Sequence, residues 1–348
     1  MWEERAHRAR RDLTAMAATG VGVGELHAAA LALVERTVGA DLACCASIDP
    51  ETLVISSMVS GEARIAPEYE PLLAAAEYSP GEPHRYATLA LRGQLAARSS
   101  ELTARERARS ARINDVWRPL GLDRELRVLF LADGACWGAI GMARAGPDFT
   151  DREVEYLAAV APVIAAATRL AVRSDVLHRA PAGPPAVAVV GGRGELCSAT
   201  PAAREWQERL DETMPGRFRV MMRVMVAGAR AEPSGGFRAR LKDGRGGWAV
   251  LEASPLLGGD EDQVAVTIEP AAGEQLFGLL LLAYALTARE CEVCREVVAG
   301  RSTTEIAGRL LISANTVQDH LKSVFAKVGV RSRGELVARL RPESGQLS

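Results

Sequence analysis

The feature that most constrains this chain is a series of helix-start signals near its C-terminus. Three Ser/Thr-x-x-Glu capping boxes follow one another, at Thr287–Glu290, Ser302–Glu305 and Ser332–Glu335. In such a box the hydroxyl and the carboxylate bond reciprocally to free backbone N–H groups at a helix start. Ser313 is a further N-cap, and Gly300 and Gly329 stand where glycines end helices. The pattern predicts four short helices, at about 288–299, 303–310, 314–328 and 333–340.

The third of these helices has one apolar face and one polar face. Its apolar residues recur at helical spacing: Val317, Leu321, Val324, Phe325 and Val328. The opposite face carries two amides, one acidic residue, two lysines and two small residues: Asn315, Gln318, Asp319, Lys322, Ser323, Ala326 and Lys327. Amides and cations are the groups that contact base edges and phosphates in a DNA major groove. Only residues 311–313 separate this helix from the one before it, a turn length typical of a helix-turn-helix.

The charge distribution favours the same interpretation. Residues 284–341 hold ten basic and six acidic side chains, so this segment is +4 while the whole chain is −2. A basic module attached to an acidic body is typical of a polyanion-binding unit joined to parts that do not bind polyanions. The alternative is a small helical bundle whose charged face is only solvated.

Residues 286–337 resemble the four-helix DNA-binding domain of the LuxR/NarL type. The positions that carry the resemblance include Leu286-Thr287, Arg289-Glu290, Glu305-Ile306-Ala307, Thr316-Val317, His320, Lys327 and Gly329-Val330. The sequence departs from the family pattern at Gln318, Asp319, Cys291 and Cys294, so a base preference does not carry over. The resemblance implies that the third helix is the recognition helix.

Two sets of site residues follow from these patterns. The expected contacts to double-stranded DNA are Thr287, Ser302, Thr303, Thr304, Ser313, Asn315, Thr316, Gln318, Asp319, His320, Lys322, Ser323 and Lys327. Among them, Gln318, Asp319 and Lys322 are expected to read bases. The resemblance further implies a dimer contact on the fourth helix through Leu336, Val337 and Leu340.

The rest of the chain divides at a Pro/Gly-rich linker (APAGPPA, 180–186) and at a softer break over 269–274. We therefore expect a multidomain chain with units at 1–178, 184–270 and 275–348. The first unit has strand patterns at 43–48, 53–59, 127–132 and 137–143, with a hairpin turn at Asp133-Gly134. A capping box at Thr150–Glu153 begins a helix that Pro162 should kink or delay.

The second unit is predicted to be small and mostly strands. Strand patterns fall at 187–190, 236–241, 248–253 and 264–268, with one helix at about 202–210. A Gly-rich turn (191–194) and a Lys-Asp-Gly turn at 242–244 separate them. The 191–194 glycines lack the Gly-Lys-Ser/Thr of a P-loop, so a turn is favoured over nucleotide binding.

The first unit resembles a GAF sensor domain, mainly in the stretch GACWGAIGMARAGPDFTDREVEYLAAVAPVIAAATR. The second resembles a PAS domain in its short strand, the segment ATPAAREW and the following hairpin. The expected fold class is thus an α+β GAF-like domain, a small α+β PAS-like domain and an all-α helix-turn-helix domain. Because GAF and PAS folds commonly hold small ligands or mediate dimerisation, the resemblance implies signal input, and it leaves the identity of any ligand open.

Catalysis, a cofactor and a metal site are not expected. The five histidines have no ligand spacing, and Cys291-x-x-Cys294 lacks a second ligand pair, so packing is favoured for both thiols. Cys44 and Cys45 should point to opposite faces of a strand, with a redox role left open for them and for Cys136. No secretory signal is evident, and the apolar run 276–286 is too short for a bilayer, so a cytoplasmic protein with no membrane contact is expected.

The sequence therefore predicts a homodimeric transcriptional regulator that binds DNA and is controlled by a signal sensed in its first two units. The rival hypothesis is a signalling adaptor whose helical module binds RNA polymerase or a sigma factor. A third hypothesis is a ligand-degrading or redox enzyme fused to a DNA-binding tail.

Overall fold

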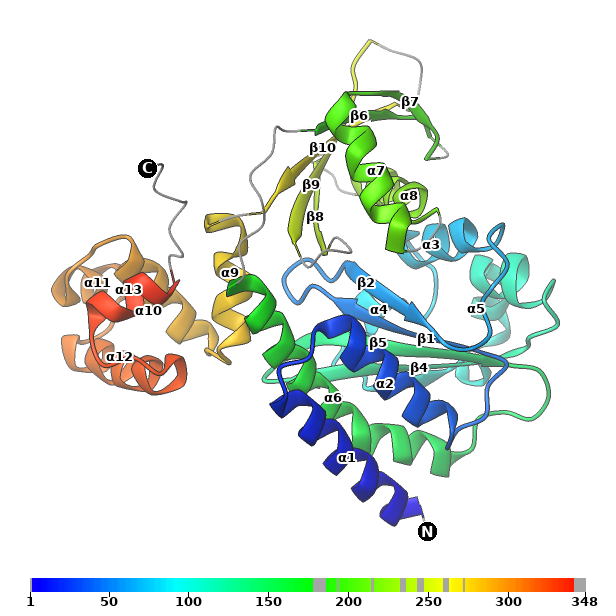
Figure 1. The fold of residues 1–348 in the computed structure, drawn as a ribbon, viewed down its shortest axis with the longest axis horizontal. Coiled ribbons are helices and arrows are strands. Elements are labelled where there is room, and N and C mark those ends of the chain that lie inside the picture. The colour runs from blue at the N-terminus through cyan, green and yellow to red at the C-terminus, as the bar shows by residue number, and fades with distance from the viewer. Residues whose placement is uncertain are drawn as a thin grey trace.

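The protein consists of two α+β domains and a helical C-terminal module that projects to one side (Figure 1). A computed structural model describes residues 2–177, 186–192, 194–213, 216–231, 236–242, 247–258, 263–271 and 273–340. The linker predicted at 180–186, residue 193 of the Gly-rich turn and residues 243–244 of the Lys-Asp-Gly turn lie wholly or largely outside these residues.

The first domain is built on a five-stranded antiparallel sheet with the order β2-β1-β5-β4-β3. Its strands are β1 (Leu42–Ile48), β2 (Ile55–Ser60), β3 (Ala96–Arg98), β4 (Arg124–Ala132) and β5 (Ala135–Arg144). β4 and β5 are joined by Asp133-Gly134, and both residues have positive φ (52° and 76°). Two positive φ values match the twist of a tight hairpin, which is why Asp-Gly is favoured there. The hairpin prediction is confirmed.

Two helices, α2 (Val23–Glu35) and α6 (Asp151–Leu177), cover one face of this sheet, and α1 (Trp2–Ala18) packs against both of them. The capping box at the start of α6 is confirmed, because Thr150 N donates to Glu153 (2.7 Å) and Glu153 N to Thr150 Oγ1 (3.3 Å). Pro162 neither delays nor ends α6, which runs through it. α6 is long and apolar enough to span a membrane, yet it packs on β4 and α1 as a core helix.

The other side of the sheet carries shorter elements. They are α3 (Glu70–Tyr78), α4 (Tyr86–Leu91), a 3-10 turn (Ser99–Glu101), α5 (Ala104–Arg109) and a π-helical turn (Arg112–Trp117). None of them was predicted. α3 also contacts the second domain, where it packs against α8 (Arg217–Ala231).

The second domain (186–270) repeats the same sheet order, β7-β6-β10-β9-β8, with antiparallel neighbours. Its elements are β6 (Ala186–Val190), β7 (Leu196–Ala199), α7 (Pro201–Thr213), α8 (Arg217–Ala231), β8 (Phe237–Lys242), β9 (Trp248–Pro255) and β10 (Val264–Pro270). The predicted strands and first helix are confirmed, but the expectation of a single helix is wrong. The additional helix, α8, lies between the predicted helix at about 202–210 and the predicted strand at 236–241. Met221, Met222 and Met225 are buried on it.

A buried ion-pair cluster ties three parts of the chain together. The Arg240 guanidinium on β8 bonds both oxygens of Asp49 in the first domain (2.6 and 2.8 Å) and reaches Glu51 (2.5 Å). Its Nη1 also donates to the carbonyl of Gln275 (2.9 Å) at the start of helix α9 (Glu274–Ala283). The Asp49 side chain is 0% exposed, so its pair with Arg240 is shielded from water. The cluster therefore holds the two domains and α9 together.

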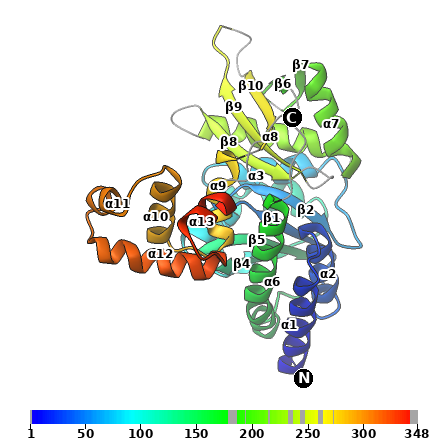
Figure 2. The ribbon, with the colours of Figure 1, turned by 60° about the vertical axis from the view of Figure 1, so that its left-hand side comes forward.

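The apolar run at 276–286 forms α9 (Glu274–Ala283), which leads into the C-terminal module. α9 packs against α6 on one side and against α10 and α13 on the other. Leu279, Leu280 and Leu281 are almost fully buried there. One continuous apolar cluster therefore runs from the core of the first domain through α9 into the module. Figure 2, turned by 60°, shows the module beside α9 and clear of the second domain.

Candidate nucleic-acid interface

The C-terminal module contains the four predicted helices: α10 (Ala288–Val298), α11 (Thr303–Leu310), α12 (Ala314–Val328) and α13 (Arg333–Leu340). The capping boxes of α10 and α11 are complete, with the hydroxyl and the carboxylate both bonded to backbone N–H groups. At α13 the Ser332 hydroxyl caps Glu335 N (3.1 Å), but the Glu335 carboxylate accepts from Arg331 N instead of the cap residue. That box is confirmed only in its first half.

The turn between α11 and α12 is tight because one residue adopts a left-handed conformation. Leu311 ends α11 with φ 54° and ψ 46°, and it is 90% exposed. An L-residue with a side chain pays a steric cost in this region. Ser313 then caps α12 by accepting from Thr316 N (3.0 Å). This turn sets the angle at which α12 leaves α11.

The two faces of α12 are divided as predicted, except that Ser323 is half-buried and bonded to Glu290 on α10. Val317, Leu321, Val324 and Val328 are buried, and Phe325 is partly buried against the same core. Asn315, Gln318, Asp319 and Lys322 are exposed on the outer face. Burial of one stripe holds the helix on the module, so the exposed stripe is presented on a rigid support. Lys322 and Asp319 form an exposed ion pair (3.2 Å), and such a pair contributes little to stability.

The Glu290 carboxylate joins α10 to the C-terminal half of α12. It accepts from Thr287 N (2.7 Å), Ser323 Oγ (2.6 Å) and Lys327 Nζ (2.6 Å). Burial alone would raise the pKa of Glu290, but these hydrogen bonds outweigh it and lower the pKa to about 2. Ser323 and Lys327 are therefore bonded to Glu290 of α10. Asn315, Gln318, Asp319 and Lys322 are exposed on the outer face of α12.

The helix N-termini differ in how their free N–H groups are compensated. At α10 and α11 a capping-box glutamate places a negative charge beside the N-terminus. α12 has a serine cap and no acidic residue in its first turn. Because a helix N-terminus carries partial positive charge, the start of α12 is the most favourable of the three for an anion such as a phosphate.

Comparison with known proteins agrees with this geometry. Residues 284–340 match the family model described as "Bacterial regulatory proteins, luxR family". Spore germination protein GerE of Bacillus subtilis is 42% identical over 55 residues, which cover 74% of that protein and 16% of this chain. The chain belongs to the luxR family of bacterial regulatory proteins.

In other relatives the matched segment is a smaller part of the protein than it is in GerE. A putative HTH-type transcriptional regulator of Mycobacterium bovis is 50% identical over 52 residues, 15% of this chain and 6% of that protein. The CsgBAC operon transcriptional regulatory protein of Escherichia coli is 43% identical over 53 residues, 15% of this chain and 24% of that protein. The chain thus spans a small part of these regulators, and the likeness lies within its C-terminal module.

Among solved structures, a phycoerythrobilin-bound GAF domain from a cyanobacterial phytochrome covers 48% of this chain and 95% of its own. Its TM-score is 0.35 with 11% sequence identity. A complex of Vibrio cholera VqmA with ligand and DNA covers 45% of this chain and 80% of its own, with TM-score 0.22 and 16% identity. At these scores neither likeness establishes a shared fold for the first two domains.

The remaining residues predicted to contact DNA or a second copy differ in exposure. Thr287, Ser302, Thr304 and Ser313 are exposed at helix starts, while Thr303, Thr316 and His320 are half-buried. Thr303 Oγ1 accepts a long hydrogen bond from Gln318 Nε2 (3.4 Å), which links α11 to α12. Leu336 and Leu340, expected at a dimer contact, are 0% and 1% exposed inside this chain. Val337 is partly buried against the same core.

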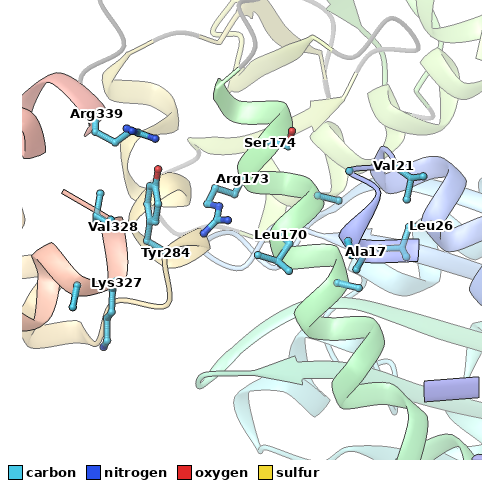
Figure 3. Close-up of a pocket in the computed structure, with 16 residues that line it drawn as sticks. Ala17, Val21, Leu26, Leu170, Arg173, Ser174, Tyr284, Lys327, Val328 and Arg339 are labelled. Carbon is cyan, nitrogen blue, oxygen red and sulfur yellow. The ribbon is translucent and has the colours of Figure 1, made fainter. Parts of the chain in front are cut away.

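A cleft of about 560 Å³ separates the LuxR-family module from the first domain. Its walls come from the end of α1 and from α6 on one side, and from the C-terminal end of α12 and Arg339 on the other (Figure 3). Arg173 of α6 points toward Tyr284, with its guanidinium 5.1 Å from the ring centre. Asn315, Gln318 and Lys322, in the first two-thirds of α12, do not line this cleft.

Some features of the module were not predicted from the sequence. Glu290 was assigned only to a capping box, and its contacts with Ser323 and Lys327 depend on tertiary packing. Cys291 and Cys294 lie in the core, as favoured, and burial raises the pKa of both thiols, that of Cys294 to about 12. They act there as small apolar side chains.

Proposed function

We propose that this protein is a sequence-specific DNA-binding regulator of transcription that acts in the cytoplasm as a homodimer. The observation that carries the proposal is the outer face of α12. It combines exposed amide and cationic side chains with a helix N-terminus that lacks acidic compensation. A helix of this kind fits a major groove and has partners for both bases and phosphates.

Base reading is assigned to the exposed residues at the start and middle of α12. Gln318 and Asn315 each present an amide that can bond the N6 and N7 atoms of adenine, and Lys322 suits the O6 and N7 acceptors of guanine. Asp319 accepts from Lys322 in the free protein (3.2 Å). On DNA it would instead favour the N4 amino group of cytosine and oppose a nearby phosphate.

Phosphate contacts are assigned to the caps and the flanking hydroxyls: Thr287, Ser302, Thr303, Thr304, Ser313, Thr316, His320, Ser323 and Lys327. Ser323 and Lys327 are bonded to Glu290 in the free protein. Lys327 keeps 33% of its side chain exposed, so it can add a phosphate oxygen without leaving Glu290. These contacts position the helix and make affinity depend steeply on salt.

A homodimer would place two modules on half-sites about one helical turn apart. Leu336 and Leu340 are occupied inside one chain. A contact between copies at α13 would therefore use Val337 and the exposed residues of that helix, or would require α13 to leave α9. The oligomeric state on DNA, measured by light scattering on the complex, distinguishes a dimer from a monomer.

The two N-terminal domains are proposed to control the module through α9. The support for this proposal is that α9 packs on α6 and receives the Arg240 bond to the carbonyl of Gln275. A change in either domain would thus reach the helix that carries the module. We further propose that the units at 1–178, 184–270 and 275–348 fold as separate domains, since each of the first two has a sheet of its own.

The test is selection of bound sequences from random DNA, followed by affinity titrations at several salt concentrations. The expected result is a defined motif and an affinity that falls steeply with salt. Lys322→Glu should abolish recovery of the motif, while Arg8→Glu, an equivalent charge reversal on the exposed face of α1, should leave it intact. A weak salt slope and no preferred sequence would contradict the proposal and support the adaptor hypothesis.

A further inference from the structure

A cavity of about 160 Å³ lies where the first domain meets the second, and no residue of the LuxR-family module lines it. Its walls come from β1, β2 and β5 of the first sheet, from α3, and from α8 of the second domain. The lining is mostly apolar and includes Leu42, Ile55, Leu73 and Met142. An apolar cavity with a few converging polar groups is typical of a small-molecule site.

The second domain supplies one wall of this cavity. Val220, Met221 and Val224 of α8 line it, and α8 packs directly on α3. Met221 and Val224 are 6% and 3% exposed, so this wall is part of the buried contact between the domains. A molecule in the cavity would touch both domains at once, and methionine at such a wall adapts readily to an occupant.

One end of the cavity is polar and buried. Tyr86 lies there with its ring against the Arg127 guanidinium (3.8 Å to the ring centre), and the Tyr86 hydroxyl faces the backbone of Gly141. A Cβ atom at Gly141 would lie 2.7 Å from that hydroxyl, so glycine keeps this end open. Burial raises the pKa of Tyr86, so its hydroxyl stays protonated and can donate or accept.

Glu77 adds an acceptor at the same end. Its side chain is 8% exposed, and its Oε1 accepts from Tyr86 N (2.7 Å). Its Oε2 lies 2.8 Å from Arg127 Nη1 but has no hydrogen bond of good geometry among the described residues. A buried carboxylate oxygen with spare acceptor capacity favours an occupant that brings an N–H or O–H donor.

The charges around the cavity disfavour an anion. Arg112 is paired with Glu125 (3.0 Å) and Glu82 (3.4 Å). Arg127 is paired with Glu77 (2.8 Å) and Glu125 (3.3 Å). Each guanidinium thus already has two carboxylate partners, and the buried carboxylates outnumber the guanidinium groups. Arg112 Nη1 and Arg127 Nε have no hydrogen bond of good geometry among the described residues, but each faces a carboxylate. An anionic ligand at either atom would add to an excess of buried negative charge, which is costly.

The volume limits the size of an occupant. An engineered apolar cavity of about 150 Å³ in another protein admits benzene. A cavity of about 160 Å³ is therefore matched to a single ring or a short chain with a small head group.

We propose that this interdomain cavity binds a small, neutral or cationic molecule with one ring or a short chain and an N–H or O–H donor, held by both domains at once. The inference rests on the proposed function, because such a molecule would be the signal that the N-terminal domains transmit. Its head group donates to Glu77 and hydrogen-bonds the Tyr86 hydroxyl, and the apolar body packs against Leu73 and the α8 wall.

The experiment uses the full chain and three probes of matched size: benzyl alcohol, benzylamine and benzoate. Binding is measured by saturation-transfer NMR titration. Benzyl alcohol and benzylamine should bind saturably, and benzoate should bind at least tenfold more weakly. Absence of saturable binding by both donor probes, or equal binding of benzoate, would overturn the proposal.

Two variants test the assigned walls. Val224→Trp should fill the cavity from α8 and abolish binding, while Val187→Trp, at an exposed site on β6 of the same domain, should not. Tyr86→Phe should weaken benzyl alcohol by about threefold to tenfold, the range for loss of one hydrogen bond. Tyr69→Phe, outside the lining, is its matched control. Unchanged probe binding by both Val224→Trp and Tyr86→Phe would overturn the assignment of the cavity walls. If Val224→Trp does not fold, unchanged benzyl alcohol binding by Tyr86→Phe alone would overturn it.

DNA binding is measured on the same samples without probe, so that the two proposals fail separately. Loss of probe binding in Val224→Trp with intact DNA binding is the expected result. Probe binding by a wild-type protein that selects no DNA motif would contradict the proposed function and leave the cavity proposal standing. A DNA motif without probe binding would do the reverse.

Discussion

Glu290→Gln should loosen the C-terminal module, because this carboxylate is the polar junction between α10 and α12. The pKa of Glu290 is lowered from its ordinary value of 4.5 to about 2. Each unit of pKa corresponds to about 1.4 kcal/mol, which gives an upper value of about 3 kcal/mol for the ionised form in the folded state. Lys327 is one-third exposed, which weakens its contribution, so we expect a loss of about 2 kcal/mol at pH 7.

The pH dependence follows from the direction of this shift. Since the folded state binds the proton more weakly than the unfolded state, the stabilisation is fully present above about pH 4.5. It is lost as the pH falls from about 4.5 to about 2, where Glu290 becomes protonated in the folded protein as well. Glu290→Gln should remove this part of the acid sensitivity of the module.

The assay is hydrogen exchange of α10 and α12 amides in the full chain, because it reports local opening of the module and not of the other domains. Glu292→Gln is the matched control: Glu292 lies two residues further on, is exposed, and pairs only with Arg289 at 2.5 Å among the described residues. We expect the opening free energy to fall by about 2 kcal/mol in Glu290→Gln and by less than about 0.5 kcal/mol in the control. Equal effects of the two substitutions would show that Glu290 does not join α10 to α12 in solution.

Three further predictions concern other parts of the chain. Arg240→Ala leaves the fully buried carboxylate of Asp49 without its partner and should destabilise the contact between the first two domains by about 3 kcal/mol, measured by denaturant unfolding; a loss below about 1 kcal/mol would contradict it. His27 is buried, its Nε2 bonds Thr168 Oγ1 (2.8 Å), and burial lowers its pKa to about 4. Because the unfolded state binds this proton more tightly, the free energy of unfolding of the first domain should fall by up to about 3 kcal/mol as the pH falls from about 6.5 to 4. A wild-type free energy of unfolding that does not change over this pH range would contradict the prediction, as would an unaltered pH dependence in His27→Gln. Leu311→Asn should raise the stability of the module by about 0.5–1 kcal/mol in hydrogen exchange, since asparagine tolerates the left-handed conformation; a decrease would show that the exposed leucine packs in solution.

The parts of the fold that were predictable are those specified by short-range chemistry. Capping boxes, a serine cap and two glycines define the ends of the four C-terminal helices, because each of these signals involves residues within four positions of one another. The Asp133-Gly134 hairpin was predictable for the same reason. The apolar stripe of α12 also follows from local spacing, and it places Asn315, Gln318 and Lys322 on the exposed face.

The parts that were missed depend on contacts between distant residues. In the sequence, α8 is an Arg- and Met-rich segment without a clear helix signal. Its burial becomes evident only from its contacts with the second sheet and with α3. The role of Glu290 requires α12 to lie across α10, and the burial of Leu336 and Leu340 requires α9 to lie beside α13. The Asp49–Arg240 pair joins residues in different domains, and no local pattern marks it.

Whether α12 reads DNA sequence can be decided by a genome-wide map of bound sites, with wild-type protein beside Lys322→Glu. We expect sharp peaks upstream of genes that share a motif, and loss of those peaks in the variant with its folding unchanged. Peaks that survive in Lys322→Glu at the same sites would contradict the assignment of α12 as the reading helix. Occupancy that follows RNA polymerase at all active promoters, with no shared motif, would contradict sequence-specific binding itself.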